Sequence, residues 1–353
     1  MKRLLLWTLA LCLLAGCGAD TPSAKEEEAP LSPVYTDWSH LTPYEATGAV
    51  YILAPGYQPG SGLTPRADYG MLLPYVGADL RVNDYITDHL PRYGLVSAGG
   101  KLVTDPIYDS VTQNGEFLIL SGGAPGSASS RMTVAAWDGR WAMDWDGSVL
   151  GCVCGRMILA GADGGLTFLN PDGGTAAVFP IEEFAPWLEQ DFRWNGADME
   201  GLSLDGTDER VVYLVSYTFT PGGDEPLRLY LDLENGTVAD TPPEGYPAEI
   251  NYDGMAQEAP ELPGYSYYET LTDPVSGQKY YFALRGAGDA PAYDLLDADG
   301  AVVYSDLDTT SGLMWQPIVG AGLFSNMESG CFCYRTLADG SLVFRYPLQN
   351  NND

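Results

Sequence analysis

The fold is decided by a pattern first seen in the stretch YGLVSAGGKLV, residues 93–103. Two apolar runs are joined there by Ala98-Gly99-Gly100, and glycine supplies the positive φ that tight hairpin turns need. The same order of an aromatic or aliphatic run, a polar turn ending in glycine and a second apolar run recurs along the chain. Further copies lie at residues 141–150, 166–173, 229–238, 293–303 and 334–343. The recurrence predicts an all-β protein built from hairpins.

The turn glycines of this repeat are unevenly spaced, which indicates a degenerate repeat with insertions. They are Gly100, Gly147, Gly173, Gly206, Gly236, Gly300 and Gly340. Their average interval of about 40 residues is typical of propeller blades. A second kind of hairpin is expected at residues 107–121, around Asn114-Gly115. We therefore expect degenerate β-hairpin repeats that form a six- or seven-bladed β-propeller-like domain, with an open β-solenoid of hairpins as the alternative.

The N-terminus has the features of a lipoprotein export signal. Lys2 and Arg3 are followed by an apolar run, residues 4–14, which is too short to span a bilayer but suits a cleaved signal. The sequence LAGC, residues 14–17, then matches a lipobox, in which the thiol of Cys17 receives a diacylglycerol. An unlipidated signal with a chance cysteine is the alternative reading. We expect Cys17 to anchor the protein to the cell membrane, facing the extracytoplasmic side.

These features divide the chain into four predicted parts. Residues 1–16 are the expected signal peptide. Residues 17–34 are polar and should form a lipidated, disordered tether, because they cannot bury enough apolar surface to offset their ordering entropy. Residues 35–92 are irregular and rich in Pro and Gly, and we interpret them as an N-terminal cover or a degenerate first repeat. Residues 93–353 are the expected β-repeat domain.

The first hairpin and its continuation resemble the WG repeat of bacterial exported and surface proteins. Tyr93-Gly94 takes the place of the aromatic-glycine pair that begins a strand in that family, and Gly99-Gly100-Lys101 takes the place of the turn. Pro106-Ile107-Tyr108-Asp109 matches the start of the next hairpin. The match covers residues 93–111, with Tyr where the family more often has Trp. Resemblance to a WG-repeat-containing bacterial lipoprotein implies a repetitive β architecture and an interaction role, and supplies no catalytic residues.

The charge of the chain limits its partners. It has 17 Lys and Arg against 48 Asp and Glu, a formal net charge of −31. Nucleic acid binding requires basic residues that neutralise phosphates, so we expect no nucleic acid partner. Cationic partners, divalent ions and neutral glycans are compatible with this charge, and the expected partner is a protein or a cell-wall glycan. The body of the protein should be repelled by anionic lipid, so the lipid on Cys17 is the expected membrane contact.

The cysteines of the body form two C-x-C pairs. Residues i and i+2 of a strand share a face, so each pair is predicted to present two thiols together. Three interpretations stay open: buried small apolar side chains, a disulfide between the pairs, or a tetrahedral zinc site. The candidate disulfide or thiol cluster consists of Cys152, Cys154, Cys331 and Cys333.

No catalytic constellation emerges from the sequence. A histidine-dependent triad would have to use His40 or His89, the two histidines of the chain. The acidic turns at Asp144 and Asp297 resemble the opening of a calcium loop but lack its closing glutamate, so a hairpin turn explains them better. Glycosidase chemistry needs two carboxylates, and the sequence singles out no pair.

We therefore expect a lipid-anchored, non-enzymatic binding protein without metal or cofactor. It should recognise a protein or a cell-envelope polymer through its β-repeat loops. The alternatives are a glycan-active hydrolase on a propeller scaffold and a structural subunit of an envelope complex. The ligand-binding residues stay unknown at this point.

Overall fold

The computed structural model describes residues 52–53, 62–81, 89–122, 132–187, 194, 197–202, 210–216, 226–248, 260–286, 292–308 and 317–350. Over these residues the chain forms 25 strands and one 3-10 helix, η1 (Ile181–Phe184). The strands make five sheets, which we call A to E. The predicted signal peptide, the tether, Cys17, His40 and Gly206 lie outside the described residues.

Sheet A is the largest sheet and consists of two units. The first unit contains β1 (Ile52–Leu53), β2 (Leu72–Arg81), β3 (His89–Ser97), β4 (Lys101–Leu102) and β25 (Gln349–Asn350). The second contains β5 (Tyr108–Asn114), β6 (Phe117–Gly122), β7 (Met132–Ala136) and β8 (Ala142–Trp145). The units are joined where Tyr93 of β3 lies opposite Tyr108 of β5.

Sheets B to E are four-stranded antiparallel meanders, in which each strand pairs with the next one in sequence. Sheet B contains β9 (Gly147–Val153), β10 (Arg156–Gly161), β11 (Leu166–Leu169) and β12 (Thr175–Phe179). Sheet C contains β13 (Ala197–Leu202), β14 (Val211–Ser216), β15 (Leu227–Asp232) and β16 (Thr237–Ala239). Sheet D contains β17 (Tyr265–Thr272), β18 (Lys279–Arg285), β19 (Ala292–Leu296) and β20 (Val302–Leu307). Sheet E contains β21 (Val319–Gly320), β22 (Leu323–Glu328), β23 (Cys331–Thr336) and β24 (Leu342–Pro347).

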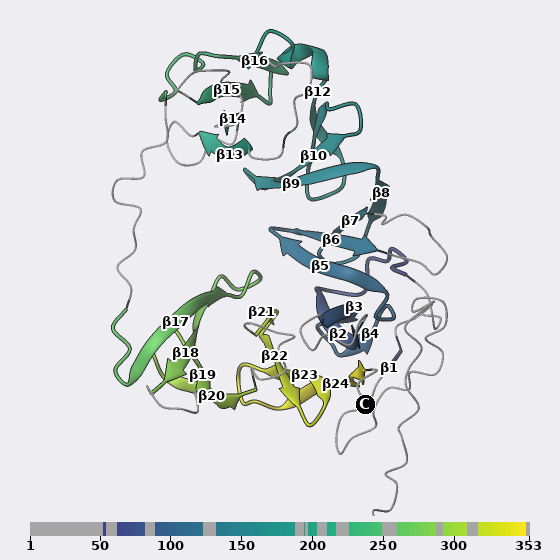
Figure 1. The fold of residues 1–353 in the computed structure, drawn as a ribbon, viewed down its shortest axis with the longest axis vertical. Helices are drawn as coiled ribbons and strands as arrows, with labels where there is room; N and C mark the ends of the chain where they lie inside the picture. Colours follow the sequence, from purple (N-terminus) through teal and green to yellow (C-terminus); the bar gives the residue numbers. More distant parts are fainter. Residues whose placement is uncertain are drawn as a thin grey trace, which may run out of the picture.

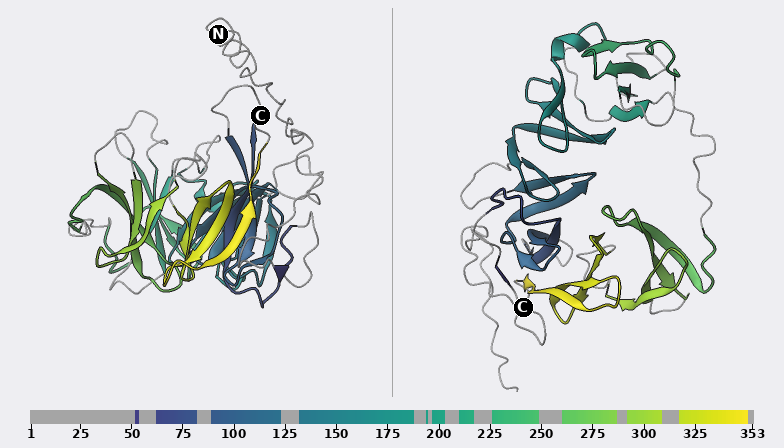
Figure 2. Two further views of the ribbon diagram at one scale, coloured as in Figure 1. Left: turned by 90° about the horizontal axis from the view of Figure 1, so that it is seen from below. Right: turned by 180° about the vertical axis from the view of Figure 1, so that it is seen from behind.

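The sheets follow one another in an arc around an opening (Figure 1). In sheets B, C and E the first strand lies towards the middle of the molecule and the last strand lies at the rim. Figure 2 shows the same succession from behind, and from below it shows the strands of neighbouring sheets standing side by side. This radial succession of short antiparallel sheets is the propeller-like, all-β architecture that the repeats predict, and that prediction is confirmed.

The predicted repeat corresponds to the last hairpin of a unit. The copies that begin at residues 93, 166, 229, 293 and 334 fold as the hairpins β3–β4, β11–β12, β15–β16, β19–β20 and β23–β24. Their turn glycines, at positions 100, 173, 236, 300 and 340, have φ between 64° and 85°. The hairpin predicted at residues 107–121 is β5–β6.

The prediction of a hairpin at residues 141–150 is wrong, because Gly147 does not lie in a turn. It is the first residue of β9, just after sheet A ends at Trp145, so this stretch connects two sheets. A β-carbon at Gly147 would overlap the carbonyl oxygen of Ala160, which explains glycine there without a turn. The hairpin that belongs to this unit is β7–β8, whose turn contains Gly139 with φ 70°.

The aromatic-glycine pair at the start of the WG-like stretch has a packing role. Gly94 lies opposite Tyr75 on the neighbouring strand β2. A β-carbon at Gly94 would overlap the Tyr75 ring, so glycine leaves the space that this ring fills. Further along, the Thr104 side chain accepts a hydrogen bond from the Leu95 backbone N–H at 2.8 Å. Tyr75, which contacts Gly94, lies before residue 93 in the chain. The predicted domain boundary after residue 92 falls inside strand β3.

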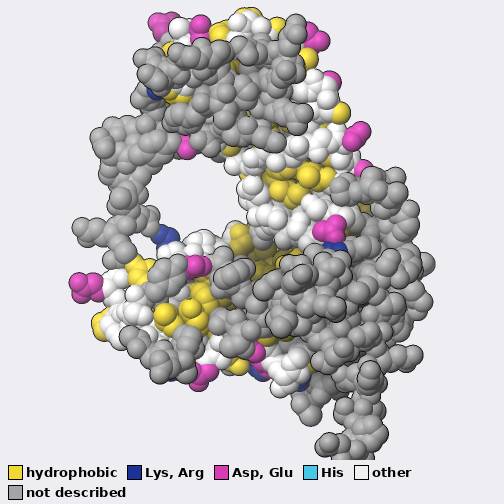
Figure 3. All heavy atoms as spheres, in the orientation of Figure 1, with side chains coloured by type: hydrophobic (Ala, Val, Ile, Leu, Met, Phe, Trp, Pro, Cys, Tyr) yellow, Lys and Arg dark blue, Asp and Glu magenta, His cyan; other side chains and the backbone are white. Residues whose placement is uncertain are grey.

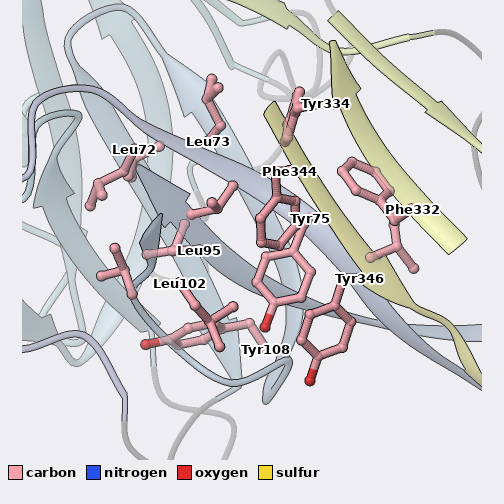
Figure 4. Close-up of a cluster of buried hydrophobic side chains, with 14 of the residues drawn as sticks. Leu72, Leu73, Tyr75, Leu95, Leu102, Tyr108, Phe332, Tyr334, Phe344 and Tyr346 are labelled. Atoms are coloured by element: carbon pink, nitrogen blue, oxygen red, sulfur yellow. The ribbon is translucent and has the colours of Figure 1, made fainter. Parts of the chain in front are cut away.

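The first and last units of the arc share the largest buried cluster (Figure 4). Tyr75 is fully buried, and its ring centroid lies 4.7 Å from that of Tyr346 and 5.2 Å from that of Phe344. The Tyr334 hydroxyl donates a 2.5 Å hydrogen bond to the carbonyl of Pro74, which lies 260 positions earlier in the chain. Aromatic packing and strand pairing between β2 and β25 thus join the two ends of the domain.

Candidate functional site

The junction between sheets C and D differs from the other junctions of the arc. One buried cluster joins both units of sheet A to sheet E, and others join sheet A to B, B to C, and D to E. Sheets C and D each have a separate cluster on the face turned away from their packed neighbour. Among the described residues, they are the one pair of successive units without a shared core. We call this junction the seam.

The seam face of sheet C is rich in tyrosine. Its cluster contains Leu202, Val211, Tyr213, Tyr230 and Tyr246. Tyr213 and Tyr230 lie opposite each other on β14 and β15, with ring centroids 5.3 Å apart. The Arg228 Nε donates a 3.0 Å hydrogen bond to the Tyr213 hydroxyl, and the Tyr230 hydroxyl donates one to the Ala248 carbonyl. The face therefore combines apolar ring surface with hydrogen-bonded polar tips.

At the edge of this face an ionic network fixes the β15–β16 turn. Both carboxylate oxygens of Asp232 accept hydrogen bonds from Arg210, at 2.6–3.1 Å, and Asp232 also accepts three from Glu234 and Asn235. The hydrogen bonds from Arg210 come first among the causes that lower the pKa of Asp232 to about 2. This carboxylate is engaged in structure and is not placed to act as a base.

The seam face of sheet D is also aromatic. Its buried cluster is formed by Tyr281, Ala283 and Leu296, against which Leu262, Tyr265 and Tyr268 pack. The Tyr268 and Tyr281 rings meet edge to face, with centroids 5.3 Å apart. The Tyr268 hydroxyl is buried and has no hydrogen-bond partner among the described residues. Buried hydroxyls are normally satisfied, so this face leaves one polar group without a partner.

A buried carboxylate lies within the same face. Asp294 of β19 is fully buried, and it accepts hydrogen bonds from the Tyr265 hydroxyl at 2.9 Å and from the Asp306 backbone N–H at 3.0 Å. Arg285 lies 3.4 Å from Asp294 and also pairs with the exposed carboxylate of Asp306. Burial, followed by the hydrogen bond to Asp294, raises the pKa of Tyr265. Asp294 and Asp306 therefore share Arg285 as their cation. The carboxylate of Asp294 is buried and is not accessible to a substrate.

Between the sheets the molecule is hollowed, and the described sheets border a wide opening (Figure 3). Outside the first unit, whose strand β2 contains Arg81, the strands that begin the units are β5, β9, β13, β17 and β21, and none of these five contains Lys or Arg. Within the described residues no group of three or more His, Cys, Asp or Glu side chains could hold a metal ion. The described part of the chain also has no helix long and apolar enough to cross a membrane.

The structure does not bring the two C-x-C pairs together. Cys152 and Cys154 belong to sheet B, whose shared cores are with sheets A and C, whereas Cys331 and Cys333 begin β23 of sheet E. None of the four forms a disulfide. Cys331 and Cys333 are buried, as in the interpretation of small apolar side chains, and burial raises the pKa of the Cys333 thiol to about 12.

Cys152 and Cys154 do not share a strand face, contrary to the sequence expectation. Cys154 lies in the turn between β9 and β10, with φ 52°, followed by Gly155 with φ 65°. A β-carbon at Gly201 of sheet C would overlap the Cys154 sulfur, and one at Gly115 of sheet A would lie 3.1 Å from the Cys152 sulfur. The two sulfurs are therefore directed towards different neighbouring sheets.

This placement predicts two classes of thiol in the native protein. Cys152 and Cys154 are half-buried and should react with N-ethylmaleimide at least about tenfold faster than Cys331 and Cys333, because burial disfavours the reactive thiolate. Peptide mass spectrometry of briefly labelled protein measures this, and labelling in denaturant should make all four equal. Labelling of Cys152 and Cys154 only after reduction would reveal a disulfide and contradict the prediction.

Sequence reasoning missed most residues of the seam. Residues 265–268 form an aromatic-rich run in the sequence, but no local pattern indicates that Tyr213, Tyr230 and Tyr281 line the faces beside one junction. Strand alternation alone could have grouped each set on one face. That sheets C and D share no core depends on the arrangement of all the sheets, which local sequence does not specify.

Comparison with known proteins identifies no family for this chain. No family model matches it, and no curated protein matches it. Solved structures that it resembles include an oligogalacturonate lyase in complex with manganese, at 10% identity and TM-score 0.34, covering 77% of this chain and 84% of that one. The β-propeller domain of the Trilobed protease from Pyrococcus furiosus is 9% identical at TM-score 0.29, covering 66% of this chain and 81% of that one. Similarities at such TM-scores carry no argument about the activity of this chain.

Proposed function

We propose that this protein is a lipid-anchored, extracytoplasmic binding protein without catalytic activity, which holds a protein or a cell-envelope polymer on a propeller-like scaffold. The observation that carries the proposal is the propeller-like scaffold, in which short antiparallel sheets follow one another around an opening (Figure 1). The lipobox at residues 14–17 supports the anchor.

The buried carboxylates of the described residues are engaged in the fold. Asp232, Asp273 and Asp294 are buried, and each accepts several hydrogen bonds from neighbouring backbone or side-chain groups. A retaining or inverting glycosidase instead needs two carboxyl groups open to the substrate. Glycan hydrolysis is therefore the outcome that would contradict the proposal.

Cross-linking of the protein in its own cells, followed by mass spectrometry, tests the proposed binding role. One or two proteins recovered near stoichiometry, with cross-linked sites in the loops of the β-repeat units, would support it. Co-sedimentation of the ectodomain with purified cell wall would support a cell-envelope polymer as the partner. Release of soluble fragments from that cell wall by the ectodomain would overturn the proposal in favour of a hydrolase.

The anchor gives a separate prediction. Cys17→Ser should abolish incorporation of radiolabelled palmitate and move the protein out of the membrane fraction, because diacylglycerol attaches to that thiol. Cys12→Ser is the matched control, since Cys12 lies in the same signal but outside the lipobox, and it should leave labelling unchanged. Equal labelling of the Cys17→Ser variant and the unmodified chain would contradict the lipobox assignment.

A further inference from the structure

The described residues include two Asn-Gly pairs, and both lie at hairpin turns. Asn114 ends strand β5 and is followed by a two-residue turn that begins at Gly115. Asn235 and Gly236 lie in the turn between β15 and β16. Both glycines have a positive φ, 59° at Gly115 and 64° at Gly236. The dipeptide is the same in both turns, so a difference in its chemistry has to come from the fold.

An Asn-Gly pair loses ammonia when the glycine nitrogen reaches the asparagine side chain. The glycine backbone nitrogen attacks the asparagine Cγ, a bond forms between them, and the bond from Cγ to Nδ2 breaks. Nδ2 leaves as ammonia with the proton from the glycine nitrogen, and a succinimide ring remains. Water then opens the ring at either carbonyl, which gives aspartate or isoaspartate. Glycine favours the attack because it has no β-carbon to obstruct the approach.

The β15–β16 turn holds both reacting groups of its pair. Nδ2 of Asn235 donates a 2.9 Å hydrogen bond to the Asp232 carboxylate, and the Asn235 backbone N–H donates one to the same carboxylate at 3.0 Å. The backbone N–H of Gly236 donates a 2.8 Å hydrogen bond to the Asp232 carbonyl. The attacking nitrogen and the amide that it would attack are therefore both engaged, and Arg210 fixes Asp232 in turn.

The β5–β6 turn leaves the corresponding groups free. Among the described residues, neither the Asn114 side chain nor the Gly115 backbone N–H takes part in a hydrogen bond, and the Gly115 carbonyl accepts one from Gln113. Asn114 is half-buried, whereas Asn235 is exposed. Exposure alone would make Asn235 the more reactive residue, and the hydrogen bonds predict the reverse order.

We propose that Asn114 is a site of spontaneous deamidation in the folded protein, and that the hydrogen bonds to Asp232 protect Asn235 from the same reaction. Water is the co-reactant, and the product carries a carboxylate in place of the amide. A β-carbon at Gly115 would lie 3.1 Å from the Cys152 sulfur of sheet B. The modification therefore falls where sheets A and B meet, and it does not depend on the proposed binding role.

Incubation of the full-length protein in water labelled with heavy oxygen tests the proposal. Labelled water marks each acid as the ring opens, and peptide mass spectrometry gives separate rates for positions 114 and 235. In the folded protein Asn114 should react at least about tenfold faster, because hydrogen bonds have to break before the ring closes at Asn235. In denaturant both turns are lost, and the two rates should converge.

Asn114→Gln is the matched variant, because its longer side chain would have to close a larger ring. It should abolish labelling at position 114 and leave the rate at Asn235 unchanged. In the unmodified protein the peptide with position 114 should yield both aspartate and isoaspartate, as a succinimide requires. A ratio of the two rates no larger in the folded protein than in denaturant would overturn the proposal, and so would aspartate as the sole product.

Discussion

Replacing Tyr75 by alanine should strongly destabilise the protein. The ring is fully buried between the first and last units, against Phe332, Phe344 and Tyr346. Truncation of a large buried aromatic side chain costs about 3–5 kcal/mol, from lost burial and the remaining cavity. The free energy of unfolding, measured by denaturant titration of the ectodomain, should fall by that amount.

Tyr75→Phe is the matched control for this prediction. It keeps the ring and removes the 2.9 Å hydrogen bond from the Tyr75 hydroxyl to the buried Thr104 carbonyl. The expected loss is about 1–3 kcal/mol, the cost of an unsatisfied buried acceptor. If Tyr75→Ala costs no more than Tyr75→Phe, the first and last units are not held together by this core.

Replacement of Asp273 should also have a large effect, and one that depends on pH. This buried carboxylate lies in the β17–β18 turn of sheet D and accepts the backbone N–H of Val275 at 2.9 Å. It also accepts the N–H groups of Ala321 and Gly322 in sheet E, at 3.0 and 2.8 Å. Asp273→Ala should cost about 2–4 kcal/mol at neutral pH, because hydrogen bonds to a charged group each contribute about 1.5–3 kcal/mol.

The pH dependence follows from the pKa of this carboxylate. Burial alone would raise the pKa of Asp273, but the hydrogen bonds from Val275, Gly322 and Ala321 outweigh it and lower the pKa below its ordinary 3.8. A group whose pKa is depressed on folding stabilises the protein above its unfolded pKa and loses this contribution as the pH falls through the folded value. The unfolding midpoints of the unmodified protein and of Asp273→Asn should therefore differ most at neutral pH. The difference should become smaller below about pH 4.

Exposed Glu183 of η1 provides the control for this series. Glu183→Gln should change the unfolding midpoint little at any pH, because surface substitutions away from special contacts usually stay within about 0.5 kcal/mol. A constant difference between the unmodified protein and Asp273→Asn across the whole pH range would show that the Asp273 side chain acts without its charge.

Several features of the fold could be predicted from local sequence because they depend on local chemistry. The turns at Gly100, Gly173 and Gly300 need a positive φ, and glycine between two apolar runs indicates such a turn directly. Gly147 shows the limit of this reasoning. Glycine is required there by a close approach of Ala160 from another strand, so the same pattern of residues predicts a turn that does not form.

The cysteines show the same limit in the candidate sites. Spacing alone places Cys152 and Cys154 on one strand face, but a two-residue turn ends β9 after Val153 and puts Cys154 in the left-handed region. One residue of difference in the position of a turn changes the neighbour of a side chain from one sheet to another. The positions of both sulfurs therefore depend on where the hairpin ends.

The sequence by itself determined that this chain is all-β, hairpin-repetitive and acidic, because period-two alternation, turn glycines and net charge are local or additive properties. Only the tertiary structure decided which hairpins end a unit, that Tyr75 meets Phe344 and Tyr346 across the ends of the chain, and that sheets C and D have tyrosine faces without a common core. The physical reason is that these contacts join residues far apart in sequence. A buried strand has the same apolar pattern whichever sheet covers it, so the pattern specifies burial and not the partner.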